Sequence, residues 1–190
     1  MKLTKQNVSV VVAIIAAIAS GVAAGISVYG SYSVERLKEE YARTRESATF
    51  IQDQIKLFYQ PISMHLIVTK GLFRRLLETM NEREKVAIEK LMRKHNSSVR
   101  DLLMNGAIYL EPGTPEAVSG GLLEHLVQWE VVYQLKYEYG VYKGPVFAGI
   151  EEFGFRGFPS EVPGYTSVDE YYLKTTEKLK EKLHRRLMGR

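Results

Sequence analysis

Three of the four histidines fall on the apolar faces of expected helices, where an imidazole could bind a ligand or a metal ion. His65 lies in the apolar row of a helix that follows Pro61, and His125 is followed five residues later by Glu130. Helical bundles hold metal ions with histidines and carboxylates that project inward from facing helices. The pattern therefore makes His65, His125 and Glu130 candidate ligand or metal residues.

The same histidines also have a structural interpretation, in which each imidazole is buried and hydrogen-bonded to a neighbour. The di-iron pattern of bundle proteins, Glu-x-x-His on two helices, does not occur in the sequence. Glu124 and His125 cannot face one site, because adjacent residues of a helix point in different directions. We expect no cofactor, and we keep a small-ligand or metal site as the alternative to structural histidines.

The sequence carries no recognisable catalytic motif. It has no HExxH, Walker A, GxSxG or EF-hand pattern. It also has no cysteine, which excludes a thiolate nucleophile, a cysteine-ligated metal centre and a disulfide. We therefore expect a protein that is not an enzyme.

The composition is that of a folded domain with an appendage. The 190 residues are 45% hydrophobic and 25% charged, and the formal net charge is +4. Lys2 and Lys5 precede a long apolar segment, so the rest of the chain carries 24 basic against 22 acidic residues. Proteins that bind nucleic acid usually have a clear basic excess, and we expect no nucleic-acid partner.

The apolar segment near the N-terminus predicts a membrane anchor. No charged residue occurs in the 29 positions between Lys5 and Glu35, and about 20 apolar residues suffice to span a bilayer. A cleaved signal peptide that ends near Ala24 is the alternative. We predict an uncleaved single-pass anchor over residues 1–33, with the lipid bilayer as a partner. Basic residues after the segment outnumber those before it and favour a cytoplasmic body: Arg36, Lys38, Arg43 and Arg45.

Small residues recur along one face of this predicted anchor. They follow each other at every fourth position and end in a GxxxG pattern: Ala13, Ala17, Gly21 and Gly25. Small side chains let two helix backbones approach closely in lipid. The row predicts packing against a second copy of the chain or against the helix of another membrane subunit.

Residues 34–60 predict a helical stalk. Apolar residues alternate there by three and four positions, as in a coiled coil, from Val34 to Phe58. Two alternatives stay open, a homo-oligomeric stalk and a helix that packs on its own domain. Pro61 lacks a backbone donor, and we expect it to kink the helix or to begin a new one.

Residues 61–190 predict a helical bundle. Apolar rows indicate helices over 62–80, 81–104 and 115–139 and from 167 onward. Asn81 with Glu84, and Ser167 with Glu170, have the spacing of helix N-caps. A long loop rich in glycine and phenylalanine separates Gly140 from Thr166. Four of its side chains either close one end of the bundle or contact a partner: Phe147, Phe153, Phe155 and Phe158.

Short motifs in residues 57–188 resemble a loosely defined group of uncharacterised bacterial membrane-anchored proteins. The motifs are Phe58-Tyr59-Gln60-Pro61, the run from Leu122 to Glu130, Phe158-Pro159 and Thr175-Thr176. This chain differs from the group in having Trp129 before the glutamate and in its longer loop. The resemblance implies an N-terminal span, a short stalk and a helical body, and it carries no activity.

Taken together, these patterns predict an all-α protein with an N-terminal transmembrane helix, a helical stalk and a small bundle. The expected function is non-enzymatic. We expect an accessory or scaffold subunit of a membrane complex, or a homo-oligomer. A membrane sensor that responds to a metal or a small ligand through its histidines is the alternative.

Overall fold

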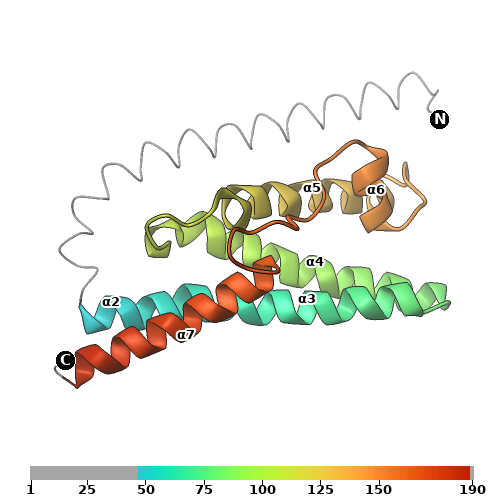
Figure 1. Cartoon of the computed structure of the whole chain (residues 1–190). Coiled ribbons are helices and arrows are strands. Elements are labelled where there is room, and N and C mark those ends of the chain that lie inside the picture. Colours follow the sequence, from blue (N-terminus) through green and yellow to red (C-terminus); the bar gives the residue numbers. More distant parts are fainter. Residues whose placement is uncertain (1–46, 189–190) are drawn as a thin grey trace.

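The computed structural model describes residues 47–188, and in this part of the chain the predicted all-α architecture is confirmed. The only β-type pairing there is an isolated bridge between Val162 and Tyr165. α3, α4 and α5 lie side by side, and α7 lies along the beginning of the first long helix (Figure 1). The α-helices are α2 (Ala48–Asp53), α3 (Gln60–Glu78), α4 (Glu82–Asn105), α5 (Gly120–Tyr137), α6 (Val146–Glu152) and α7 (Val168–Leu187).

The helical backbone of the first long helix, from α2 to α3, is continuous through Pro61, and α3 begins at Gln60 with Pro61 in its first turn, which agrees with the second expectation for this proline. A π-helical segment, η1 (Gln54–Tyr59), joins α2 directly to α3. Its last turn has the wider spacing of a π-helix, in which the backbone N–H of Gln60 donates to the carbonyl oxygen of Ile55. The extra residue of this turn comes immediately before the proline. The helix thereby continues past a residue that has no N–H to donate.

The described part of the predicted stalk, residues 47–60, packs on the chain's own domain, which is the second of the two alternatives. Ile51, Phe58 and Tyr59 are fully buried and belong to the same core cluster as residues of α5 and α7. The body of the protein therefore begins before residue 61, because the residues that read as coiled-coil positions face the bundle core. The earlier part of the predicted stalk, residues 34–46, lies outside the described residues.

The predicted helix starts are confirmed in α4 and α7. The Asn81 side chain accepts hydrogen bonds from the backbone N–H groups of Arg83 and Glu84, at 3.0 and 3.4 Å. The Ser167 hydroxyl accepts from the backbone N–H of Glu170 at 3.4 Å. Each side chain thus satisfies donors that the first turn of a helix leaves without an intrahelical partner.

The expected irregular loop between Gly140 and Thr166 contains a short helix, α6, and this corrects its description as a continuous loop. Val146 and Ile150, four residues apart, are buried against α5, and Gly149 allows the close approach. Gly154, with φ of 69°, takes the left-handed conformation that ends the helix. Residues 155–167 then cross the bundle without forming a further helix.

The buried side chains form two separate core clusters. The first cluster joins the beginning of the long helix, the end of α4, the start of α5 and α7, with Phe58, Leu122 and Tyr172 at its centre. The second joins the end of α3, the start of α4, the end of α5 and α6, with Met92 and Trp129 among its members. The bundle is therefore packed at both ends, with a boundary between the clusters near the middle of α3 and α5.

A buried carboxylate fastens α6 to the bundle. Glu89 of α4 is only 1% exposed, and it accepts hydrogen bonds from Lys136 Nζ at 2.7 Å and from the Tyr137 hydroxyl at 2.5 Å. Its second oxygen accepts from the backbone N–H of Val146 at 2.8 Å. A buried charge needs this degree of compensation. Here the three donors come from α5 and from the first residue of α6.

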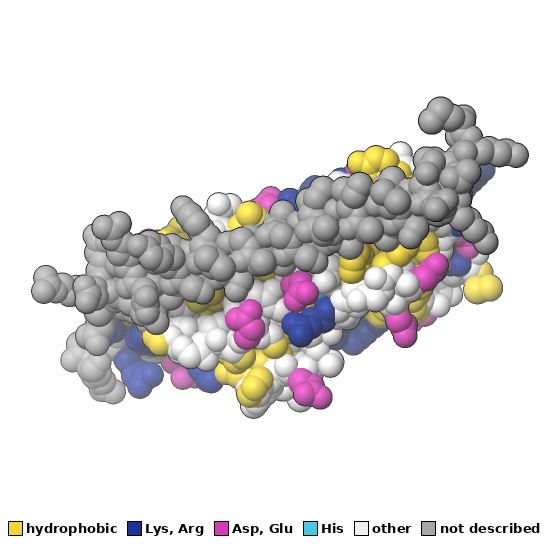
Figure 2. All heavy atoms as spheres, turned by 90° about the horizontal axis from the view of Figure 1, so that it is seen from above, with side chains coloured by type: hydrophobic (Ala, Val, Ile, Leu, Met, Phe, Trp, Pro, Cys, Tyr) yellow, Lys and Arg dark blue, Asp and Glu magenta, His cyan; other side chains and the backbone are white. Residues whose placement is uncertain are grey.

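The surface carries charges of both signs. On the face seen in Figure 2, acidic and basic side chains are interspersed with hydrophobic ones. Several are paired, as in the contacts of Lys70 with Asp169 and of Arg156 with Glu124. No helix within residues 47–188 has both the length and the apolar character needed to cross a bilayer. The predicted anchor, residues 1–33, lies outside the described part of the chain.

A glycine-to-alanine pair tests the close packing of α6. At Gly149 an added Cβ would lie 2.5 Å from Val132 Cγ1 and 2.9 Å from Tyr142 Cε1, whereas at Gly71 no atom lies within 4 Å. Gly149→Ala should lower the free energy of unfolding by about 1–3 kcal/mol through overpacking. Gly71→Ala should raise it by about 0.5–1 kcal/mol, since alanine favours the helix. Chemical denaturation of both variants measures the difference, and equal effects would contradict the packing described.

Candidate functional site

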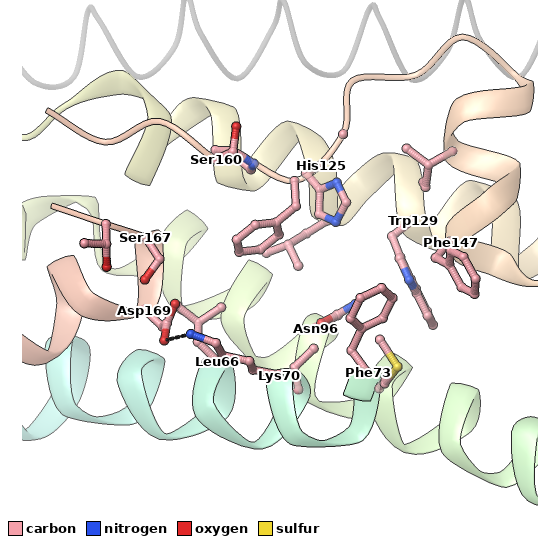
Figure 3. Close-up of a pocket in the computed structure, with 18 residues that line it drawn as sticks. Leu66, Lys70, Phe73, Asn96, His125, Trp129, Phe147, Ser160, Ser167 and Asp169 are labelled. Atoms are coloured by element: carbon pink, nitrogen blue, oxygen red, sulfur yellow. Dashed lines mark hydrogen bonds and ion pairs between the residues drawn. The ribbon is translucent and has the colours of Figure 1, made fainter. Parts of the chain in front are cut away.

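A cavity of about 530 Å³ opens between α3, α4 and α5 at the boundary of the two core clusters. Its wall takes Leu66 and Leu126 from one cluster and Met92, Trp129 and Ile150 from the other. α6 and the crossing segment after it cover the remaining side (Figure 3). Ligand sites in proteins are typically clefts or cavities of about 300–1,000 Å³ with mainly apolar walls, so this cavity is the candidate site of the described residues.

Aromatic side chains supply much of the cavity wall. Phe73 and Phe147 meet edge to face, with ring centroids 5.5 Å apart, and Phe158 meets the His125 ring in the same way at 5.2 Å. Trp129 belongs to the second core cluster and stacks on Tyr133, with ring centroids 5.5 Å apart. These rings come from α3, α5, α6 and the crossing segment. The wall therefore presents flat apolar surfaces to a ligand.

Two buried polar groups of the wall have no partner in the described part of the chain. Asn96 is 6% exposed and Trp129 is 3% exposed, and neither the carboxamide nor the indole N–H makes a hydrogen bond to residues 47–188. Figure 3 shows the Asn96 side chain directed from α4 toward the space next to Phe73 and Trp129. The polar atoms of Asn96 and Trp129 face the open cavity, where a ligand group could pair with them. Among the described wall residues, Thr69 Oγ1 is the side-chain atom that is both buried from solvent and without a hydrogen-bond partner.

The charged groups of the wall neutralise each other. Lys70 Nζ and Asp169 Oδ2 lie 2.7 Å apart and join α3 to the first turn of α7. The Lys70 side chain is 47% exposed and Asp169 is 21% exposed, so the pair sits at the rim of the cavity. The cavity interior consequently carries no net charge from these two residues.

His125 lies at the cavity wall as an uncharged imidazole. Burial lowers its pKa from the usual 6.5 to about 4, against the opposing effect of the Arg156 carbonyl oxygen, which lies 3.4 Å from Nδ1. Arg156 is itself held by Glu124, at 3.3 Å. With Nδ1 as donor to the carbonyl, Nε2 is left as a hydrogen-bond acceptor.

The other candidate ligand residues do not join His125. His65 faces His95 across the α3–α4 contact, with 2.8 Å between the two Nδ1 atoms, and Glu130 is bound by Arg93. Within residues 47–188, no three or more histidines, aspartates and glutamates are grouped so that they could hold a metal ion. His65 and Glu130 thus contact His95 and Arg93, and of the three candidates only His125 lines the cavity.

The four phenylalanines of the predicted loop divide between the core and the surface. Phe147 belongs to α6 and lines the cavity, while Phe153 and Phe155 pack against the second core cluster. Phe158 also lines the cavity but is 45% exposed. Three of the four, Phe147, Phe153 and Phe155, are thus partly buried against the second core cluster. The helix-packing residues of the predicted anchor, which end at Gly21 and Gly25, lie outside the described residues.

Two important polar residues, Glu89 and Asn96, were not identified from the sequence. They stand seven residues apart, and Leu103 follows after another seven, so all three lie on the buried face of α4. The sequence does place both polar residues within the apolar row of this helix, and that position would have marked them as buried. The inward orientation of Trp129 was predicted, but its unpaired N–H follows only from the packing around it.

Comparisons of the chain with protein families, with curated proteins and with solved structures find no match. The physical properties of the cavity therefore carry the functional argument by themselves.

The histidines predict a loss of stability in acid. Burial lowers the pKa of His125, and burial together with the neighbouring imidazole lowers that of His65. The unfolded chain therefore binds more protons than the folded chain below pH 6.5, and the free energy of unfolding should fall as the pH drops toward 4. His125 contributes up to about 3 kcal/mol of this loss. Denaturant titrations at pH 7.5, 6, 5 and 4 should show a smaller pH slope for His125→Gln, and equal slopes would contradict the assignment.

Proposed function

We propose that this protein is a non-enzymatic binding protein whose helical body holds a small, mainly apolar molecule in the cavity between α3, α4 and α5. The observation that carries this proposal is the cavity itself, about 530 Å³ in volume and lined largely by apolar and aromatic side chains. Ligand sites in proteins typically measure about 300–1,000 Å³ and combine such walls with a few polar groups. Asn96, Trp129 and His125 are the polar groups here.

The membrane anchor predicted for residues 1–33 is part of the proposal. It would hold the body close to the bilayer, with the body on the cytoplasmic side. Binding of an apolar molecule by such a body is the behaviour of a membrane-anchored sensor or carrier. The proposal needs no metal ion, because the candidate metal residues His65 and Glu130 have other partners.

The proposal predicts saturable binding of an uncharged naphthalene probe. Trp129 is the only tryptophan of the chain and lines the cavity, so energy transfer from it to bound N-phenyl-1-naphthylamine reports binding near the cavity. Thr69→Phe adds a ring at the cavity wall and should weaken binding at least tenfold. Val68→Phe adds the same ring at the adjacent position, which is 43% exposed, and should leave binding unchanged. Absence of saturable transfer, or equal binding by the two variants, would refute the proposal.

A second candidate function, self-association as a scaffold or accessory subunit, is favoured by an exposed apolar row on the long helix. Met64 and Val68 are 60% and 43% exposed and lie four residues apart, on one side of α3. Leu57, in the π turn before them, is 54% exposed. A second copy of the chain is the occupant that we propose for this row.

The mass of the full-length protein tests this second candidate. Native mass spectrometry should give a multiple of 21.6 kDa for the unchanged chain. Met64→Lys places a charge in the apolar row and should shift the protein to a monomer, whereas Met104→Lys, at a similarly exposed position at the end of α4, should not. A monomeric unchanged chain would rule out self-association and leave the cavity proposal untouched.

A further inference from the structure

The cavity wall also limits the chemical class of its ligand. The limits come from three features: the absence of a free charge on the described wall, the unpaired polar groups of Asn96 and Trp129, and the surrounding rings. Each feature excludes some ligands and favours others. This inference rests on the proposed binding function.

A charged ligand group would find no counter-charge among the described wall residues. Lys70 and Asp169 are the charged residues of the wall, and they are bound to each other at 2.7 Å. A ligand carboxylate or ammonium would have to separate this pair or enter an apolar space without compensation, and burial of an unpaired charge is strongly unfavourable. His125, the remaining titratable wall residue, is uncharged at neutral pH.

The unpaired groups call for a hydrogen-bond acceptor on the ligand. The indole N–H of Trp129 can only donate, and the Asn96 carboxamide can donate through its NH₂. Both side chains are more than nine-tenths buried and line the same cavity. A carbonyl oxygen accepts two hydrogen bonds and could satisfy both donors, while the rings of Phe73, Phe147 and Phe158 would contact a flat apolar body.

We infer that the cavity binds an uncharged, ring-containing molecule that carries a carbonyl group, with Asn96 and Trp129 as the donors to its oxygen. Asn96 is then a specificity-determining residue of the site. Trp129 contributes both ring contact and a hydrogen bond.

Two pairs of matched probes test the inference on the full-length protein. The charge pair is uncharged N-phenyl-1-naphthylamine and its sulfonate, 1-anilinonaphthalene-8-sulfonate. The carbonyl pair is 6-propionyl-2-(dimethylamino)naphthalene and N,N-dimethyl-2-naphthylamine, which lacks the ketone. Energy transfer from Trp129 gives each dissociation constant. The uncharged probe should bind at least tenfold more tightly than the sulfonate. The ketone should bind at least about fivefold more tightly than its parent, since one net hydrogen bond gives about that factor and the second adds to it.

Variants of α4 separate the hydrogen bond from general packing. Asn96→Leu keeps the size of the side chain but removes one of the two donors, and it should reduce the preference for the ketone and shift the bound ketone's emission to shorter wavelength. Asn105→Leu, at the exposed end of the same helix, should change neither. Circular dichroism confirms that each variant is folded before binding is compared.

The outcomes distinguish the inference from the proposed function. Equal or tighter binding of the sulfonate, or a ketone preference that Asn96→Leu leaves undiminished, would overturn the ligand class while leaving the cavity a binding site. Failure of every probe to bind would overturn both. Ketone selectivity that is reduced in Asn96→Leu but not in Asn105→Leu would support both.

Discussion

The position of α6 on the bundle depends on the hydrogen bonds that the Glu89 carboxylate accepts. This carboxylate is almost completely buried, and its hydrogen bonds to Lys136, Tyr137 and the backbone of Val146 join α4 to α5 and α6. The loss of hydration on burial is compensated only while all three donors stay in place. Because α6 in turn carries Phe147 and Ile150 to the cavity wall, the shape of the binding site follows from this buried charge.

The cavity exists because the two core clusters do not merge. α4 spans both clusters, and its buried face changes from apolar residues to Asn96 where the clusters meet. The Asn96 carboxamide lines the cavity together with Trp129 and His125. The cavity therefore lies between two well-packed core clusters, and residues of both clusters form its walls.

Helical periodicity predicted most of the helices and the caps at Asn81 and Ser167, because those features depend on residues a few positions apart. It did not predict which faces meet. His65 pairs with His95 only because of how α3 turns back on α4, and that register depends on the whole interface. α6 was missed because seven residues hold too few apolar positions to show a period. The cavity depends on packing across several helices, which no single stretch of sequence records.

The continuous helix from Ala48 to Glu78 has a structural consequence. Because the π turn carries it past Pro61, its 31 residues form one rod roughly 45 Å long, with Leu66 and Thr69 at the cavity and Ala48 at the end that joins the N-terminal segment. The first half of this helix is packed in the first core cluster through Ile51 and Phe58, and its second half borders the cavity. The segment next to residue 47 and the cavity wall are therefore parts of one element, whose packing depends on both.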